Sequence, residues 1–282
     1  MASGPKFADL VPRLVSAFVL LGVAGLGLWL GGPVLALLLS VLGAVMLWEY
    51  FRLIVRLTKP FAMGATVITA ALLAVSLILE DRFAVTAEAT DSALPQVLAP
   101  APVALIVMAL AMLAVMAVVR KSWLETAFGA MIPAATFLFF YLHQSVPAAM
   151  WLVVATVIAT DVAGYFFGKL IGGPKFWPTL SPNKTWAGTV SGWLCAALIA
   201  VAVGWSSPFG TVIVGVLFLM VVSFAAQMSD IAESALKRRA GVKDSSNLLP
   251  GHGGVLDRFD GMMGGFLVAG LTFVLVGYAM VP

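Results

Sequence analysis

Charged and small polar residues are concentrated in one stretch of an otherwise apolar chain, residues 229–261. This stretch holds five basic and five acidic residues, although only 10% of the whole chain is charged. Four polar residues in it recur every three or four positions and would share one face of a helix: Asp230, Glu233, Ser234 and Lys237. Carboxylates can hold a divalent cation, and basic side chains can neutralise phosphate. The spacing therefore indicates chemistry on a phosphorylated substrate.

A glycine-containing loop follows this helical face and leads to two further carboxylates, Asp257 and Asp260. Glycines beside basic residues let backbone N–H groups approach phosphate oxygens closely. Carboxylates opposite them can hold Mg²⁺, which takes only one or two protein carboxylates beside substrate phosphates. Asp260 has a second interpretation, as the N-cap of the following helix. A solvated helix end would explain the charges before residue 240, because acidic-to-basic order suits the helix dipole, but it leaves the loop unexplained.

A second group of polar residues lies between residues 160 and 188. Asp161 is a carboxylate in an apolar run, where burial is costly, so it marks either a functional site or a structural ion pair. Ser181, Lys184 and Thr185 offer hydroxyl and ammonium donors just before an expected helix. Such an arrangement suits the binding of an anion.

The rest of the composition is that of a membrane protein. Of the 282 residues, 62% are hydrophobic, and the mean hydropathy of +1.07 is too high for a soluble domain. The single Cys195 excludes a disulfide framework. Gly164 and Gly168 are four residues apart and are expected to let two helices pack closely. We expect an all-α polytopic integral membrane protein with about nine transmembrane helices, near residues 14–30, 33–48, 61–79, 102–119, 125–142, 147–168, 186–205, 208–228 and 261–281.

The basic residues predict how these helices are oriented. With the N-terminus in the cytoplasm, alternating spans place 15 of the 16 basic residues in cytoplasmic segments, and only Arg82 falls outside. The C-terminus would then lie outside, and residues 229–261 would face the cytoplasm, where nucleotides are available. We interpret residues 14–30 as a span, since no small-residue cleavage site follows. We expect residues 1–145 to form N-terminal transmembrane helices and residues 146–282 to form the catalytic region.

Both groups of polar residues resemble motifs of the phosphatidate cytidylyltransferase, or CDP-diacylglycerol synthase, family. The resemblance rests on Ser-x₂-Lys-Arg-x₄-Lys-Asp at 234–244 and Pro-Gly-His-Gly-Gly-x₂-Asp-Arg-x-Asp at 250–260. Residues 181–188 are similar to a second family motif, Ser-Pro-x-Lys-Thr-x-Glu-Gly. Two positions depart from the family pattern, because Ala187 stands where Glu is general and Ser229 where Gly is usual.

The resemblance implies that CTP and phosphatidate react to give CDP-diacylglycerol and pyrophosphate, with Mg²⁺ as cofactor. Whether K⁺ or a second divalent ion takes part stays open. The expected partners are CTP, phosphatidate and membrane lipids, without nucleic acid, and the resemblance implies a homodimer. We expect the protein to reside in a bacterial inner membrane.

The resemblance and the residue chemistry together assign roles to individual side chains. We expect direct roles in catalysis for Asp230, Lys237, Arg238, Asp257 and Arg258. The expected metal ligands are Asp230, Asp257, Glu233 and Asp260. The expected substrate-binding residues are Asp161, Ser181, Lys184, Thr185, Ser234, Lys243, Asp244, His252, Gly253 and Gly254. His252 could donate to a phosphate or shape the glycine loop.

Two alternative functions stay open at this point. A CTP-dependent transferase or kinase could act on another lipid phosphate or alcohol. An ion-coupled secondary transporter would also place a carboxylate such as Asp161 in a membrane helix, next to glycine-broken helices. The released product separates them, since pyrophosphate marks a nucleotidyl transferase and CDP marks a kinase.

The polar residues outside these motifs receive simpler interpretations. Glu49 and Glu125 flank apolar runs beside basic residues, so we expect ion pairs at the membrane interface. His143 follows an apolar run and is expected to be an interfacial polar residue.

Overall fold

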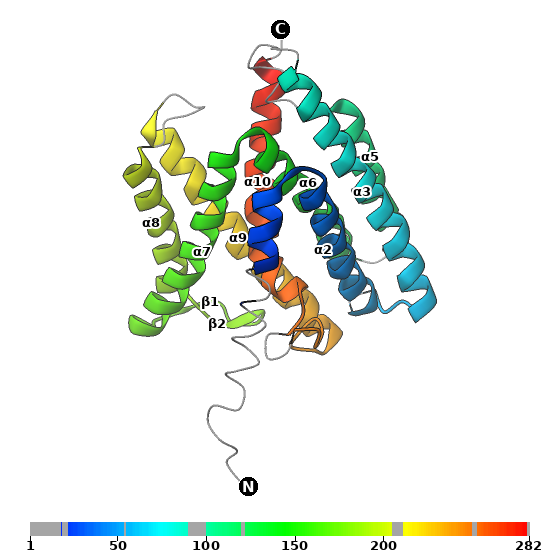
Figure 1. Cartoon of the computed structure of the whole chain (residues 1–282). Helices are drawn as coiled ribbons and strands as arrows, with labels where there is room; N and C mark the ends of the chain where they lie inside the picture. The colour runs from blue at the N-terminus through cyan, green and yellow to red at the C-terminus, as the bar shows by residue number, and fades with distance from the viewer. Residues whose placement is uncertain are drawn as a thin grey trace.

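The computed structural model describes residues 18, 22–53, 55–89, 100–119, 122–204, 211–249 and 253–280. These residues form helices almost throughout, as the long apolar runs predict (Figure 1). A helical segment over residues 22–30 comes first. The helices that follow are α2 (Gly32–Leu53), α3 (Lys59–Ala89), α5 (Pro102–Val118), α6 (Trp123–Ser145), α7 (Pro147–Leu170), α8 (Trp186–Val203), α9 (Val212–Ala240) and α10 (Leu256–Met280).

Seven of these helices are long and apolar enough to cross a membrane. The predicted run near 102–119 forms the shorter helix α5, of 17 residues. The predicted run near 14–30 lies partly outside the described residues. Many apolar side chains point outward, among them Val67, Ile106 and Leu198, which are 64%, 60% and 67% exposed. Apolar side chains exposed on this scale indicate lipid as the surroundings of the bundle.

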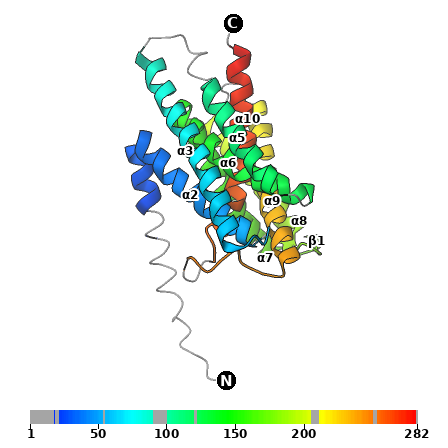
Figure 2. The same ribbon diagram turned by 90° about the vertical axis from the view of Figure 1, so that its right-hand side faces the viewer.

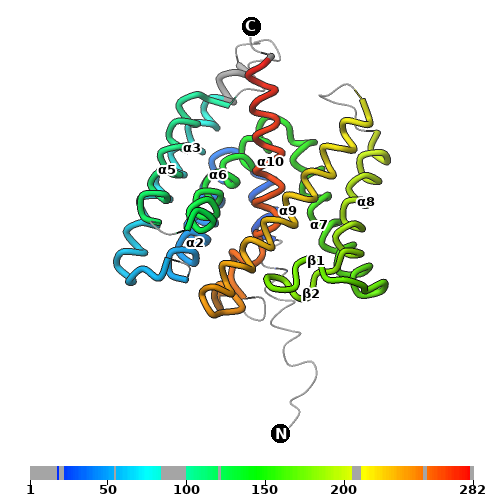
Figure 3. Tube along the Cα trace, turned by 180° about the vertical axis from the view of Figure 1, so that it is seen from behind, coloured from blue at the N-terminus to red at the C-terminus, as the bar shows by residue number. Residues whose placement is uncertain are grey.

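Helix α10 runs through the middle of the molecule (Figure 1). Helices α7 and α8 lie on one side of it, and α2, α3, α5 and α6 lie on the other. Helix α9 crosses α10 diagonally, from the side of α8 to the side of α2, as the view from behind also shows (Figure 3). A view turned by 90° places the C-terminal end of α9 and the strand β1 at the end of the bundle opposite the C-terminal end of α10 (Figure 2). The charged stretch identified in the sequence thus gathers at one end of the bundle.

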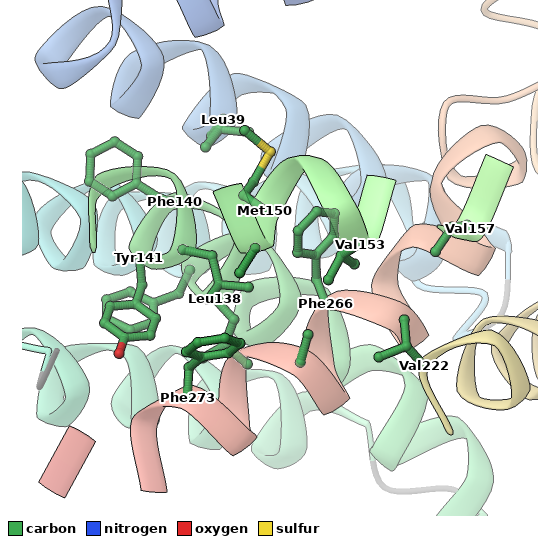
Figure 4. Close-up of a cluster of buried hydrophobic side chains, with 14 of the residues drawn as sticks. Leu39, Leu138, Phe140, Tyr141, Met150, Val153, Val157, Val222, Phe266 and Phe273 are labelled. Carbon is green, nitrogen blue, oxygen red and sulfur yellow. The ribbon is translucent and has the colours of Figure 1, made fainter. Parts of the chain in front are cut away.

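One of two apolar clusters among the described residues joins the helices on both sides of α10. Figure 4 shows side chains of α2, α6, α7, α9 and α10 meeting there, among them Leu39, Leu138, Met150, Val222 and Phe266. Lipid tails are as apolar as these side chains, so close van der Waals packing holds the helices together more than expulsion of water does. The cluster packs α10 against α9 and α7. These three helices carry polar site residues nearer one end of the bundle.

Helices α7 and α8 approach each other closely because glycines line their contact. A Cβ atom at Gly188 would lie 2.5 Å from the carbonyl oxygen of Gly164 and 3.2 Å from Cα of Gly168. Real Cβ atoms do not come this close to backbone, so a larger residue would push the helices apart. Gly164 and Gly168 therefore serve helix packing, as their spacing predicts.

A short β-hairpin before α8 was not expected from the sequence. Strand β1 (Lys175–Trp177) pairs antiparallel with β2 (Ser181–Thr185). The strands have three and five residues and include Pro182, so they carry too little periodicity to predict. Thr185 ends β2 and caps α8, where its hydroxyl accepts a hydrogen bond from the Gly188 N–H at 3.2 Å. The all-α prediction is confirmed for the described residues, and the hairpin is one small addition to it.

Helices α9 and α10 both extend further than the apolar runs predict. The run near 208–228 belongs to a continuous helix that ends at Ala240, with Gly241 in a left-handed conformation at φ 79° as its C-cap. Helix α10 begins at Leu256 and not at 261. Asp257 and Asp260 therefore lie inside α10, and the interpretation of Asp260 as an N-cap is wrong.

The glycine contact between α7 and α8 can be tested by adding one methyl group. We expect Gly188→Ala to lower the free energy of unfolding by about 1–3 kcal/mol relative to a matched control, because its Cβ meets rigid backbone. The control is Gly64→Ala in α3, where a Cβ would meet nothing within 4 Å. Both changes gain the same helix propensity, so that contribution cancels. Thermal unfolding in detergent measures the difference, and equal unfolding temperatures would contradict the close contact.

Candidate active site

The C-terminal part of α9 presents its polar residues along one face, as their spacing predicts. The Lys237 Nζ lies 2.7 Å from the Glu233 Oε2, one helical turn earlier. The Ser234 hydroxyl lies 3.5 Å from the Asp230 Oδ1, on the same face. This face points toward α10 and the loop that joins the two helices.

Three carboxylates from α9 and α10 converge on this face: Asp230, Glu233 and Asp260. One carboxylate oxygen from each lies within 4.8 Å of the others. The Glu233 side chain is 0% exposed, and its Oε1 has no hydrogen-bond partner among the described residues. Carboxylates this close repel one another unless a cation lies among them, and oxygen ligands are those that Mg²⁺ prefers. This acidic triad could therefore hold a metal ion.

Asp257 lies beside the triad but is engaged differently. Its Oδ1 accepts a hydrogen bond from Lys237 at 2.7 Å. Its Oδ2 accepts from the Ser245 N–H at 2.8 Å, the Ser245 hydroxyl at 2.9 Å and the Gly254 N–H at 2.8 Å. Donors of the chain itself therefore surround both oxygens, and Asp257 ties the loop to α9 through Lys237.

The second predicted motif reaches the same place through the hairpin. Lys184 in β2 forms an ion pair with the Asp230 Oδ2 and lies 3.5 Å from the backbone carbonyl oxygen of Gln227. Asp161 in α7 is close enough for its charge to interact with those of Asp230 and Lys184. The structure thus brings the two sequence motifs together, although about 50 residues separate them along the chain.

The other predicted site residues take several positions around this cluster. Arg238 is exposed and donates to the Val242 carbonyl at 3.2 Å, at the C-terminal end of α9. Lys243, Asp244 and Arg258 are exposed, and Ser181 is half-buried in β2. Thr185 is buried as the N-cap of α8, so its hydroxyl supports the helix. His252 lies outside the described residues, together with Pro250 and Gly251.

The two described glycines of the loop make room for carboxylates of the chain itself. Gly253 has a φ of +83°, and a Cβ there would lie 2.9 Å from the Asp257 Oδ2. A Cβ at Gly254 would collide with the Ser245 hydroxyl and lie 2.8 Å from the Glu49 Oε1. The sequence suggested that these glycines let phosphate approach. In the structure the absence of a Cβ at both positions lets the loop fold around Asp257 and Glu49.

Glu49 is a residue whose part in the site the sequence did not reveal. It lies in α2, is 1% exposed, and accepts hydrogen bonds from the Val255 and Leu256 N–H groups at 3.1 and 2.7 Å. The expected interfacial ion pair is wrong, because its partners are donors of the loop after α9. A glutamate at the end of an apolar run gives no signal for a contact so remote in sequence.

Glu125 also differs from the expected ion pair. Its carboxylate accepts from the Ser122 N–H at 3.2 Å, and its own N–H donates to the Ser122 hydroxyl at 3.4 Å. This reciprocal capping box starts α6. The Ser-x-x-Glu spacing was a sequence signal that could have predicted it.

The two departures from the family pattern lie next to this cluster. The Ser229 hydroxyl is buried and donates to the backbone carbonyl of Asp260, so it links α9 to α10 beside the triad. Ala187 is half-buried in the first turn of α8, beside the N-cap Thr185. The serine adds one inter-helix hydrogen bond that a glycine could not make.

His143 lies away from this cluster. Its Nδ1 lies 3.3 Å from the Gln144 Oε1, and its Nε2 lies 3.2 Å from the Leu28 carbonyl oxygen. It therefore links the C-terminal end of α6 to the first helical segment.

Comparison with known proteins places this arrangement in one family. The family model described as "Cytidylyltransferase family" matches residues 11–277. The phosphatidate cytidylyltransferase of Brucella suis biovar 1 (strain 1330) is 45% identical over 117 residues, which cover 39% of this chain and 40% of the relative. The phosphatidate cytidylyltransferase of Staphylococcus aureus (strain COL) is 38% identical over 165 residues, which cover 56% of this chain and 62% of the relative. Because the family model spans nearly the whole sequence, the chain belongs to the cytidylyltransferase family.

Proposed function

We propose that this protein transfers the cytidylyl group of CTP to phosphatidate, giving CDP-diacylglycerol and pyrophosphate for phospholipid synthesis. The observation that carries the proposal is the meeting of the acidic triad with Lys184 and Lys237 at one end of an apolar bundle. A site of this kind can take a nucleotide from water and a lipid phosphate from the membrane. The relatives named phosphatidate cytidylyltransferase support the same substrates.

In the proposed reaction a phosphate oxygen of phosphatidate attacks the α-phosphorus of CTP. The new P–O bond forms as the bond between the α-phosphorus and the bridging oxygen breaks, and pyrophosphate leaves with that electron pair. No general base is required, because a phosphate monoester is already ionised at neutral pH. The protein must bring two strongly negative groups together, so positioning and charge neutralisation supply most of the catalysis.

Asp230, Glu233 and Asp260 would hold Mg²⁺, and the Glu233 Oε1, which has no hydrogen-bond partner in the described part of the chain, supports a ligand there. The bound ion would supply charge neutralisation for triphosphate oxygens. Asp257 was predicted as a further ligand, but its four donors favour a supporting role through Lys237. The participation of K⁺ or a second divalent ion is part of the same proposal.

Basic and hydroxyl side chains would bind the phosphates of both substrates. Lys184 would contact phosphate while it stays near Asp230, and arginine is suited to bidentate contact with phosphate. The remaining residues proposed to contact or orient substrate are Asp161, Ser181, Thr185, Ser234, Lys237, Arg238, Lys243, Asp244, His252, Gly253, Gly254 and Arg258.

The proposed orientation places the site in the cytoplasm, the N-terminus inside and the C-terminus outside, because nearly all basic residues then lie inside. Lipid would enter from the bilayer, and CTP would enter from water. Residues 146–282 would form the catalytic region of a homodimer in a bacterial inner membrane. The seven apolar helices support a membrane location, and the organisms of the relatives support a bacterial one. The transporter alternative loses support, because the carboxylates lie with lysines at the end of the bundle where the loops meet.

The proposed reaction can be tested with purified protein in detergent, radiolabelled CTP, phosphatidate and Mg²⁺. We expect label in the lipid and pyrophosphate in solution, and Asp260→Asn should lower the rate at least about a hundredfold by removing one triad charge. The matched control is Asp81→Asn in α3, a buried aspartate that accepts a hydrogen bond from Gln144 and should keep its activity. Release of CDP in place of pyrophosphate would identify a kinase.

Metal binding at the triad can be tested without substrate. We expect Mg²⁺ to raise the thermal unfolding temperature of the wild type, because a ligand at about 100 times its Kd stabilises the folded state by about 2.7 kcal/mol. Asp260→Asn should lose this stabilisation, and Asp81→Asn should keep it. Among the described residues Asp260 forms no ion pair, so its substitution breaks none. Equal stabilisation of Asp260→Asn and the wild type would refute the triad as the metal site.

A further inference from the structure

The carboxylate of Glu49 reaches from α2 into the loop that precedes α10. Its Oε1 accepts from the Ser246 hydroxyl and the Val255 N–H, and its Oε2 accepts from the Ser245 hydroxyl and the Leu256 N–H. Each oxygen thus accepts from one backbone N–H and lies beside one hydroxyl, and the single proton of the Ser245 hydroxyl is shared with the nearer Asp257 Oδ2. Among the described residues its partners are all hydroxyl and N–H groups, and a buried carboxylate of this kind can accept from the free N–H groups at the start of a helix.

The loop leaves space for this carboxylate because one of its residues, Gly254, has no side chain. Gly254 stands where any Cβ would lie 2.8 Å from one Glu49 oxygen and 2.9 Å from the other. The Val255 and Leu256 N–H groups lie at the beginning of α10, which has no earlier residue of its own helix to accept from them. Glu49 therefore supplies acceptors for two N–H groups at the start of α10.

Glu49 is connected to the acidic triad through a short series of polar contacts. The Ser245 hydroxyl lies between two carboxylates, 3.3 Å from the Glu49 Oε2 and 2.9 Å from the Asp257 Oδ2. Asp257 contacts Lys237, and Lys237 contacts Glu233, each at 2.7 Å. A shift of the loop would therefore move Lys237 and, through it, Glu233, which is one of the proposed metal ligands.

We propose that Glu49 is a positioning residue, whose buried carboxylate holds the loop and the first turn of α10 so that Asp257, Lys237 and Glu233 keep their places. The expected effect on cytidylyl transfer rests on the proposed function, whereas the effect on the loop does not. Through Glu49, the N-terminal part of the chain supports a site whose other members all come from residues 146–282.

The test variant is Glu49→Gln, which keeps the size of the side chain but replaces one acceptor by an NH₂ donor. Whichever way the amide is turned, that donor faces a backbone N–H of either Val255 or Leu256, so at least one hydrogen bond is lost. We expect hydrogen exchange in the peptide covering residues 245–256 to accelerate at least about tenfold in the full chain in detergent. The Mg²⁺ concentration that gives half of the thermal stabilisation should rise, and kcat should fall at least about tenfold.

The matched control is Glu125→Gln, which removes a carboxylate from the capping box of α6 at the same end of the bundle. It should change exchange near residues 122–126 and leave the Mg²⁺ half-saturation unchanged. Ser246→Ala keeps the Glu49 carboxylate and removes one donor to it, but it also removes the acceptor of the Leu248 N–H at 3.1 Å. It should therefore give a smaller change in the same direction that is diagnostic at residues 253–256, away from Leu248. This milder variant decides the question if Glu49→Gln does not fold.

Two results would overturn the proposal. One is unchanged exchange in residues 245–256 in both Glu49→Gln and Ser246→Ala. The other is faster exchange spread evenly over α2, α6 and the loop with an unchanged Mg²⁺ half-saturation, which marks a general contribution to stability. The exchange measurement needs neither CTP nor lipid, so a wild type without cytidylyl transfer would refute the proposed function and leave this test intact.

Discussion

The pairing of Lys237 with both Glu233 and Asp257 is the interaction on which the polar end of this molecule depends. Its ammonium group lies 2.7 Å from each carboxylate, and the side chain is only 12% exposed. Removing charges from water is costly, so such a cluster persists only when each charge is compensated and hydrogen-bonded. Lys237 compensates one carboxylate from each of two helices, which joins α9, α10 and the loop between them.

The membrane setting explains why this cluster lies where it does. Outward-facing apolar side chains and close glycine contacts hold the helices in lipid, where polar groups must find partners within the protein. At the end of the bundle, α9 and α10 extend beyond the predicted apolar runs, and the charged residues belong to those extensions. The proposed transfer from a soluble nucleotide to a lipid phosphate would require a site at such a boundary.

Much of the fold could be predicted from hydropathy, because spanning helices are long and continuously apolar. The helical face of Asp230, Glu233, Ser234 and Lys237 was also predictable, since contacts within two helical turns follow from spacing alone. The hairpin before α8 was not, because two strands of three and five residues carry little periodicity. The start of α10 was misplaced, because its first turn is polar and hydropathy detects only the apolar part.

By itself, the sequence determined the membrane class, the approximate helices, the resemblance to the family and the residue types of the site. Only the tertiary structure decided which carboxylates stand together. Asp260 joins Asp230 and Glu233, whereas Asp257 turns to Lys237 and the loop. Glu49 accepts from Val255, 206 residues away, and no local pattern encodes a contact of that range. A carboxylate binds whichever donors or cations the folded chain brings to it, so its role is set by packing and not by its position in a motif.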